Sequence, residues 1–303
     1  MKADGSGIRN KKISRDSVTL LTMILPFLLL FVFCTVLPIV ISLILSFFDY
    51  DVVNSPIFIG IDNYTRMFTG DEIFPISLKN TLLFAAITGP VSFALSFLLA
   101  WMLNDFKRFS RSLLSFLFYS PALVGNAYFV WQILFHGDSY GYVNSILISL
   151  NLISEPIQWF RTPAYAVVLV MAVQLWMGMG VAFLANLAGL QNVNSELYEA
   201  GIIDGIQNRW TELWYITLPL MRSILLFGCV MQIQNSFSIS TIATVLTGFP
   251  SVNYSTETIV THLTDVGTSR FEMGYACAIS VVLFAMMMIA RIIVGKLLNK
   301  TGE

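Results

Sequence analysis

The sequence predicts an all-α membrane protein with six transmembrane helices, and two observations support this. Of the 303 residues, 56% are hydrophobic and only 12% are charged, whereas soluble globular chains average about 25% charged residues. The chain also contains six long windows without Asp, Glu, Lys or Arg, each holding roughly the 20 apolar residues that cross a bilayer core. These windows cover residues 17–48, 80–104, 112–137, 162–195, 223–256 and 273–290.

The first window is expected to be a transmembrane helix rather than a cleavable signal peptide. Its apolar run far exceeds the roughly 7–15 residues of a signal core, and no A-x-A-like cleavage site follows it. A seventh uncharged window, residues 139–154, is shorter and contains several Ser and Asn residues. It is expected to form a short interfacial or re-entrant helix.

The basic residues predict the orientation of the chain. Thirteen of the seventeen Lys and Arg residues fall in the N-terminal tail, in the connections after the second and fourth windows, and near the C-terminus. Positive residues concentrate on the cytoplasmic side of a membrane, so both termini are expected in the cytoplasm. The predicted organisation is a cytoplasmic tail over residues 1–16 and a membrane domain over residues 17–303.

Several kinds of chemistry are not indicated. The net charge of −1 gives no sign of a nucleic-acid partner, and Cys34, Cys229 and Cys277 are spaced too widely for a disulfide framework or a zinc site. His136 and His262 have no second histidine or carboxylate at ligand spacing along the chain, so no metal site and no cofactor are expected. There is no nucleophile–base arrangement and no G-x-x-x-x-G-K-[ST] phosphate loop. The chain is therefore expected not to be an enzyme.

The connection over residues 190–219 contains the most specific pattern. Asn194 or Ser195 can cap a helix by accepting a backbone N–H bond, and Glu196 is favourable in the first turn of that helix. Gly205 supplies a helix stop. A second helix is expected to follow, so the connection is predicted to form a helix–turn–helix elbow.

The second helix is expected from about Arg209 to Pro219. Amphipathic helices that lie on lipid headgroups usually carry Lys and Arg on their polar face, whereas this stretch is acidic. The composition thus favours a basic protein partner, with attachment to headgroups as the alternative. Small and acidic residues share the first part of the elbow: Glu199, Ala200, Gly201, Asp204 and Gly205.

This elbow resembles the EAA loop of binding-protein-dependent ABC importer permeases. The match consists of Glu199-Ala200-Gly201, then Asp204-Gly205, then Ile216-Thr217-Leu218-Pro219. Gly201 replaces the usual second alanine, and the ten residues between Gly205 and Ile216 are one more than expected for the family. The resemblance implies a coupling helix that sits in a cleft on a separate, dimeric ATPase subunit. Its coupling residues would be Glu199, Ala200, Gly201, Asp204 and Gly205.

Five further segments resemble, in order, sugar-uptake permeases of the maltose-permease type. The resemblance implies the type I ABC importer permease fold and ATP-driven import of a sugar or oligosaccharide across a bacterial cell membrane. The implied partners are a second homologous permease, an extracellular solute-binding protein and the ATPase. The segments are IGIDNYTRMF, SLKNTLLFAAITGP, LWMGMGVAFLANLAGLQNVNSELYEA, NSFSISTIATVLTGFPS and FEMGYACAISVVLF.

Polar residues in the fourth and fifth windows are candidates for the sugar site, because polar groups within a bilayer are costly and tend to face a cavity or another helix. The apolar Val181 and Ile239 depart from maltose permease, so maltose itself is not the expected substrate. Alternatively, the amides and hydroxyls bond neighbouring helices, and the glycines permit close packing. Alignment with maltose permease implies a site formed by Gln174, Trp176, Gly178, Gln232, Asn235 and Ser236.

Other functions stay open at this point. A permease for another solute, such as a peptide or glycerol phosphate, is the nearest alternative, although a phosphate would call for basic residues that the windows lack. A secondary transporter would need an intramembrane Asp, Glu or His, and the windows contain no Asp or Glu. A structural or receptor subunit is a further alternative.

Overall fold

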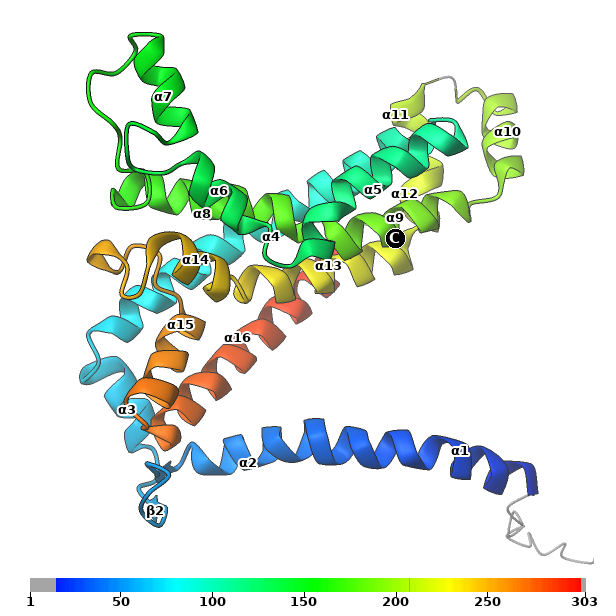
Figure 1. Ribbon diagram of the computed structural model, residues 1–303. Coiled ribbons are helices and arrows are strands. Elements are labelled where there is room, and N and C mark those ends of the chain that lie inside the picture. The colour runs from blue at the N-terminus through cyan, green and yellow to red at the C-terminus, as the bar shows by residue number, and fades with distance from the viewer. Residues whose placement is uncertain (1–14, 207, 301–303) are drawn as a thin grey trace, which may run out of the picture.

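A computed structural model describes residues 15–206 and 208–300 of the chain (Figure 1). Helices dominate it. Within the described residues the single sheet consists of two short strands, β1 (Phe48–Asp49) and β2 (Ile57–Phe58), which pair antiparallel with Phe48 opposite Phe58. The expected tail over residues 1–16 lies outside the described residues except for its last two, which begin helix α1.

Three described segments are each long and apolar enough to cross a membrane. The first combines α1 (Arg15–Phe31), a π-helix (Val32–Val36) and α2 (Leu37–Leu45). The second is α4 (Ile73–Asn104) and the third is α16 (Met273–Lys300). These helices correspond to the first, second and sixth uncharged windows.

Bent helix pairs account for the other three windows. Helices α5 (Arg108–Val124) and α6 (Tyr128–Leu134) meet at 90°, and α8 (Pro163–Gly178) and α9 (Gly180–Gln191) meet at 40°. The third pair joins the segment Arg209–Leu220 to the segment Arg222–Thr247 at 82°. The second of these segments contains α13 (Arg222–Phe237) and α14 (Ser240–Thr247) and covers most of the fifth window. The described chain thus has three helices long and apolar enough to cross a membrane, or up to six if each bent pair is one span.

The third window differs most from a single straight helix. Helix α5 ends at Gly125, whose φ of +67° lies in the left-handed region that favours glycine. The chain then turns sharply into α6. A charge-free window cannot reveal such a bend, because hydropathy does not register a change of direction within an apolar stretch.

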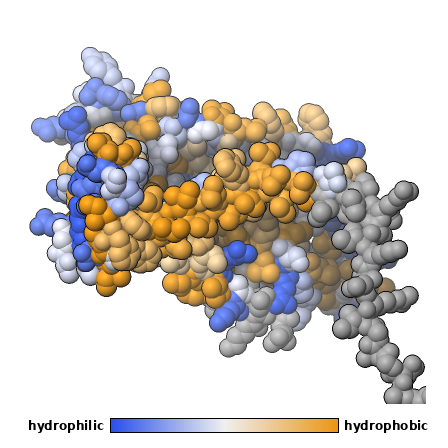
Figure 2. All heavy atoms as spheres, turned by 90° about the horizontal axis from the view of Figure 1, so that it is seen from below, coloured by the Kyte–Doolittle hydropathy of each residue, from blue (hydrophilic) through white to orange (hydrophobic). Residues whose placement is uncertain are grey.

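The bundle is built around α4, which packs against α9 and α13, while α13 also packs against α16. Phe97 of α4, Phe183 of α9 and Leu225 of α13 belong to one buried apolar cluster. By contrast, α1 and α2 extend away from the bundle, and only α2 packs against α16 (Figure 1). Seen from below, hydrophobic side chains form a band across this side of the molecule (Figure 2).

The shorter elements gather at two opposite ends (Figure 1). One end holds α10 (Ser195–Ile203), α11 (Arg209–Glu212), a π-helix (Leu213–Thr217) and α12 (Leu218–Leu220). The start of α1 and the end of α16 point toward this same end. The other end holds the strands, α3 (Asp62–Thr69), α7 (Tyr142–Ser149), a 3-10 turn (Val252–Tyr254), α15 (Ile259–Thr264) and a π-helix (Asp265–Ser269).

The short window at residues 139–154 forms a short helix, as expected. It contains α7, and Asn144 of that helix is fully buried. The Asn144 side-chain amide donates to the backbone carbonyls of His136, Asp138 and Ile157 at 3.0–3.2 Å. The Asn144 side chain therefore holds together the chain segments that precede and follow α7.

Candidate functional site

The first helix of the predicted elbow begins and ends where its sequence signals lie. The side-chain oxygen of Asn194 accepts the backbone N–H of Glu196 at 3.1 Å, which caps α10. After the helix, Gly205 has a φ of +92°. The N–H of Ile206 donates to the Gly201 carbonyl at 2.9 Å, and the N–H of Gly205 donates to the Ile202 carbonyl at 3.1 Å. This is the Schellman pattern of a helix C-terminus, so both predicted boundaries are confirmed.

The second part of the elbow is not a uniform α-helix. It starts at Arg209, as predicted, behind a cap in which the Asn208 side chain accepts the N–H of Trp210 at 3.1 Å. It then passes through the π-helix Leu213–Thr217. A π turn closes its hydrogen bond over one residue more than an α turn. The stretch between Gly205 and Ile216 therefore runs into this wider turn.

Arg209 fastens the elbow to the end of α4. Its guanidinium forms an ion pair with Asp105 and lies 4.5 Å from the centre of the Trp101 ring. The rings of Trp101 and Trp210 are 5.1 Å apart between centroids. These contacts join α11 to the end of the helix at the centre of the bundle.

The elbow exposes a compact mixed surface. Glu199, Ala200 and Asp204 are exposed, and Ile202 and Ile203 are 64% and 86% exposed. Exposed large apolar side chains beside carboxylates are typical of a protein-binding surface, since an interface core is apolar and its rim is polar.

Gly201 is not part of this exposed surface. It is buried, and a Cβ built on it would come 2.6 Å from Cδ1 of Ile216. Its lack of a side chain therefore lets α10 pack against the following π-helix. The hydroxyls of Tyr198 and Thr217, 3.3 Å apart, join the same two elements.

Four of the six predicted sugar-site residues contact one another between α8 and α13, whereas the Trp176 ring lies 5.9 Å from that of Trp131 and Ser236 lies beside Gly89 of α4. The Gln174 side-chain amide donates to the Asn235 carbonyl at 2.9 Å, and the Gln232 amide donates to the Gly178 carbonyl at 2.9 Å. Gln174, Gln232 and Ser236 are buried, whereas Trp176 and Asn235 are half-buried. The Ser236 hydroxyl donates to the Ile233 carbonyl within its own helix.

These bonds favour the alternative in which the amides join neighbouring helices. The two acceptor carbonyls lie at helix breaks, Gly178 at the end of α8 and Asn235 three residues before the break at Ser238. Carbonyls at helix ends lose their α-helical partner and need a donor within a membrane. Gln232 supplies one to Gly178, whereas the Asn235 carbonyl accepts both the Gln174 amide and the backbone N–H of Ser238 at 3.2 Å. The cavity of about 470 Å³ beside Gln232 is lined mainly by apolar side chains.

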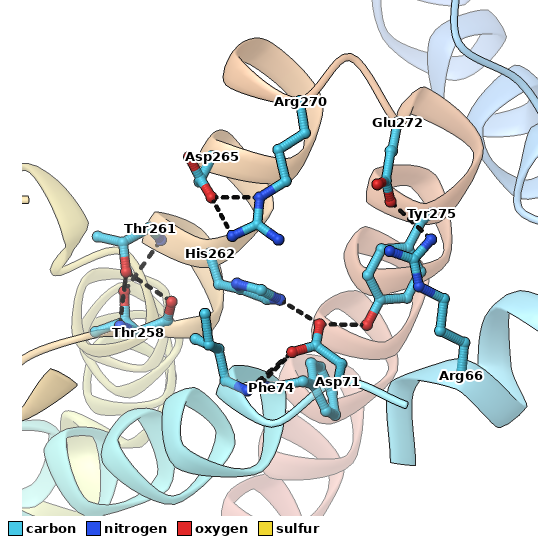
Figure 3. A network of polar contacts seen from close by, with 11 residues as sticks. Arg66, Asp71, Phe74, Thr258, Thr261, His262, Asp265, Arg270, Glu272 and Tyr275 are labelled. Atoms are coloured by element: carbon cyan, nitrogen blue, oxygen red, sulfur yellow. Dashed lines mark hydrogen bonds and ion pairs between the residues drawn. The ribbon is translucent and has the colours of Figure 1, made fainter. Parts of the chain in front are cut away.

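A polar network at the end opposite the elbow was not found from the sequence (Figure 3). Oδ2 of Asp71 lies 2.7 Å from Nε2 of His262 and accepts the hydroxyl of Tyr275 at 2.6 Å. Oδ1 of Asp71 accepts the backbone N–H of Phe74 at 3.1 Å. Burial alone would raise the pKa of Asp71, but the Tyr275 and Phe74 hydrogen bonds and the neighbouring His262 outweigh it, and the pKa is lowered.

A second ion pair lies beside this network. Nη1 of Arg66 is 2.7 Å from Oε2 of Glu272, and the guanidinium stacks 4.4 Å from the Tyr275 ring centre. Together these contacts tie α3, α4, α15 and α16 to one another. Within residues 15–206 and 208–300, no group of three or more His, Cys, Asp or Glu side chains could hold a metal ion.

Comparisons with known proteins place the chain among transport proteins. No family model matches the sequence. The chain is 31% identical over 292 residues to the probable ABC transporter permease protein YesP of Bacillus subtilis (strain 168), covering 95% of this chain and 93% of that protein. It is 31% identical over 274 residues to the arabinooligosaccharides transport system permease protein AraP of the same organism, covering 90% and 86%.

Another relative is the sulfoquinovosyl glycerol transport system permease protein SmoG of Agrobacterium fabrum (strain C58 / ATCC 33970). It is 32% identical over 234 residues, covering 76% of this chain and 73% of that protein. Among solved structures, the fold matches a chain of a bacterial alginate ABC transporter in complex with an alginate pentasaccharide-bound periplasmic protein. That match has a TM-score of 0.79 at 20% identity, covering 96% of this chain and 97% of the other.

Proposed function

The chain belongs to the permease family of ABC transporters, and we propose that it is the transmembrane subunit of an ATP-driven importer for a sugar or oligosaccharide. Two of the similar permeases are named for arabinooligosaccharides and sulfoquinovosyl glycerol, which supports a glycan substrate. The alginate transporter with the same fold was solved with a periplasmic protein that holds its pentasaccharide. A binding protein that delivers the sugar is therefore part of the proposal.

The elbow carries the coupling part of this proposal. Its two capped ends fix α10 in position, and its exposed surface combines Glu199 and Asp204 with Ile202 and Ile203. A cleft with basic groups at its rim and an apolar floor would complement this surface. A separate dimeric ATPase subunit would provide that cleft, and its closure on ATP would push the elbow.

The push would reach the bundle along two routes. Helix α10 follows α9 after the short turn at residues 192–194, and the π-helix Leu213–Thr217 leads through α12 into α13. The Arg209–Asp105 pair adds a direct contact with the end of α4. Because α4, α9 and α13 pack together, these helices would tilt as one body. Such a rigid-body movement would alternate access to the pathway.

The proposed assembly places the remaining partners on other surfaces. A second homologous permease would cover apolar helices that lie outside the bundle, for which the segment Thr22–Leu45, 0% buried, is a candidate. The binding protein would dock at the end with α3, α7 and α15. This arrangement sets the elbow and both termini in the cytoplasm and the protein in the bacterial plasma membrane.

The experiment is to reverse one charge on the elbow in the complete transporter. Glu199→Lys is expected to abolish co-purification of the ATPase and to lower sugar-stimulated ATP turnover at least tenfold. The matched control for co-purification of the ATPase is Glu155→Lys, because Glu155 is also exposed but lies in the connection between α7 and α8, at the opposite end. Unchanged assembly and unchanged turnover in Glu199→Lys would overturn the coupling role.

A further inference from the structure

A pocket of about 380 Å³ lies between α14, α15 and the π-helix Asp265–Ser269, at the end of the molecule opposite the elbow (Figure 1). Seven of its ten lining residues are Ser or Thr. One wall is formed by Phe249, which is 45% exposed. A volume of this size falls within the range of about 300–1,000 Å³ that is usual for small-ligand sites.

Several hydroxyls in this pocket have no partner within the protein. Most membrane-helix hydroxyls bond back to a carbonyl of the preceding turn, as Thr88 does to Phe84 at 2.8 Å. The hydroxyls of four pocket residues make no hydrogen bond within the part of the chain that the structure describes: Ser240, Thr241, Thr244 and Ser269. Each offers one donor and two acceptor sites, so they are available to a polyhydroxylated ligand.

The charge of the pocket favours a neutral ligand over an acidic one. Its one charged lining residue is Asp265, and Oδ2 of that carboxylate accepts Nε and Nη2 of Arg270 at 2.9 and 2.8 Å (Figure 3). The positive charge of Arg270 is thus already paired, and no Lys or Arg lines the pocket. A uronate carboxylate would enter beside Asp265 without a counter-charge.

A run of exposed polar residues on the fifth window, the Gln234 stripe, ends at the pocket. Gln234 lies in the last turn of α13, Ser238 at the break between α13 and α14, and Thr241 in α14, and all three are exposed. Polar side chains facing hydrocarbon are costly, so this stripe is expected to face a hydrated path or a partner. Thr241 belongs both to the stripe and to the pocket.

A second pocket of about 430 Å³ is also lined by residues of α14, together with the charged Arg161. Some of its polar groups are paired: Nδ1 of His136 lies 3.2 Å from Asp138, and the Gln158 amide donates to the Gly137 carbonyl at 2.8 Å. The Arg161 guanidinium suits an acidic ligand, whereas the free groups of the first pocket are uncharged hydroxyls.

We propose that the pocket bounded by Ser240, Thr241, Thr244, Phe249 and Ser269 is an entry subsite that binds one residue of a neutral sugar. The hydroxyls hydrogen-bond to the sugar, the Phe249 ring packs against its C–H face, and the Gln234 stripe leads onward into the membrane. This subsite rests on the proposed function and adds to it a preference for uncharged glycans.

The test uses the full chain in phosphatidylethanolamine–phosphatidylglycerol nanodiscs. Saturation-transfer NMR would measure binding of three neutral probes, arabinotriose, galactotriose and maltotriose, and of trigalacturonate as the acidic probe. We expect at least one neutral trisaccharide to bind, with its apparent Kd raised fivefold or more in Thr241→Val, Thr244→Val and Phe249→Ala. The control is Thr65→Val, at an exposed position of α3 that does not line the pocket, and it should leave the Kd unchanged.

Thermal unfolding of each variant shows whether it is folded, and Thr→Val keeps the shape of the side chain. Absence of binding by every neutral trisaccharide, equal binding of trigalacturonate, or an unchanged Kd in folded Thr241→Val and Thr244→Val would overturn the subsite. None of these results depends on the ATP turnover of the complete transporter, which is measured separately with Glu199→Lys. Failure of the subsite is therefore distinguishable from failure of the proposed function.

Discussion

Nε2 of His262 lies 2.7 Å from Oδ2 of Asp71, although 191 residues separate them in the sequence. The histidine side chain is 1% exposed and the aspartate side chain 11% exposed. Asp71 immediately precedes α4, and His262 belongs to α15. This contact, with the Tyr275 hydroxyl on the same oxygen, holds the first and last thirds of the chain together.

Replacing His262 should destabilise the protein far more than replacing the other histidine. His262→Ala removes one partner of the enclosed Asp71 carboxylate, and loss of a partner by a buried polar group typically costs about 1–3 kcal/mol. Thermal unfolding of the chain in nanodiscs, followed by tryptophan fluorescence, would show a clearly lower midpoint. The control is His136→Ala, since His136 and its partner Asp138 are 58% and 64% exposed and exposed pairs contribute little. Equal midpoints for the two variants would contradict the structural role.

The same network predicts sensitivity to acid. Because the pKa of Asp71 is lowered in the folded protein from an ordinary value of 3.8, the folded state favours the charged carboxylate. Its contribution to stability is fully present above the ordinary pKa and is lost as the pH falls through the lowered folded value. The unfolding midpoint of the wild type should therefore drop from about pH 5 downward.

Asp71→Asn should have a lower midpoint at pH 6 and a flatter dependence on pH between 6 and 3. The comparison is made at constant ionic strength, so that screening of surface charges does not change. If the unfolding midpoints of the wild type and of Asp71→Asn fall in parallel as the pH is lowered, the Asp71 carboxylate does not contribute to the loss of stability in acid.

Two glycines in α16 should respond in opposite ways to substitution by alanine. A Cβ on Gly274 would lie 2.0 Å from the backbone oxygen of Phe48 and 3.0 Å from the nitrogen of Tyr50. Gly274→Ala must push the strand β1 away from the helix, at a cost of about 1–3 kcal/mol. A Cβ on Gly295 meets nothing within 4 Å, so Gly295→Ala should leave the unfolding midpoint unchanged or raise it. The interpretation fails if Gly274→Ala unfolds at the wild-type temperature.

Features set by neighbouring residues could be predicted from the sequence. The elbow is an example, because a cap such as Asn194 and a left-handed stop such as Gly205 act within one helical turn. The positions of the helical segments likewise follow from local hydrophobicity. The bend at Gly125 and the contact between Asp71 and His262 depend on packing between distant segments, which a single sequence does not record.

The polar residues of the fifth window show a different limit of prediction from the sequence. Spacing alone places Gln232, Asn235 and Ser236 on one face, but it does not say whether that face meets a cavity or a helix. The structure turns Gln232 and Ser236 inward and leaves Gln234 and Ser238 exposed. In a sequence, amides that join neighbouring helices and amides that face a ligand therefore have the same spacing, and the sugar site stays a prediction.

Substitution of the two neighbouring glutamines separates these roles. Gln232→Leu removes the bond to the Gly178 carbonyl across the helices, and bonds of this kind contribute roughly 0.6–2 kcal/mol in membranes. We expect a lower unfolding midpoint, with sugar uptake reduced only in proportion to the loss of folded protein. Gln234→Leu, at an exposed position, should keep the wild-type midpoint and lower sugar uptake by the complete transporter at least threefold. The opposite result would be a fully folded Gln232→Leu variant without sugar uptake, together with wild-type uptake in Gln234→Leu. It would show that the sugar binds at the buried face between α8 and α13.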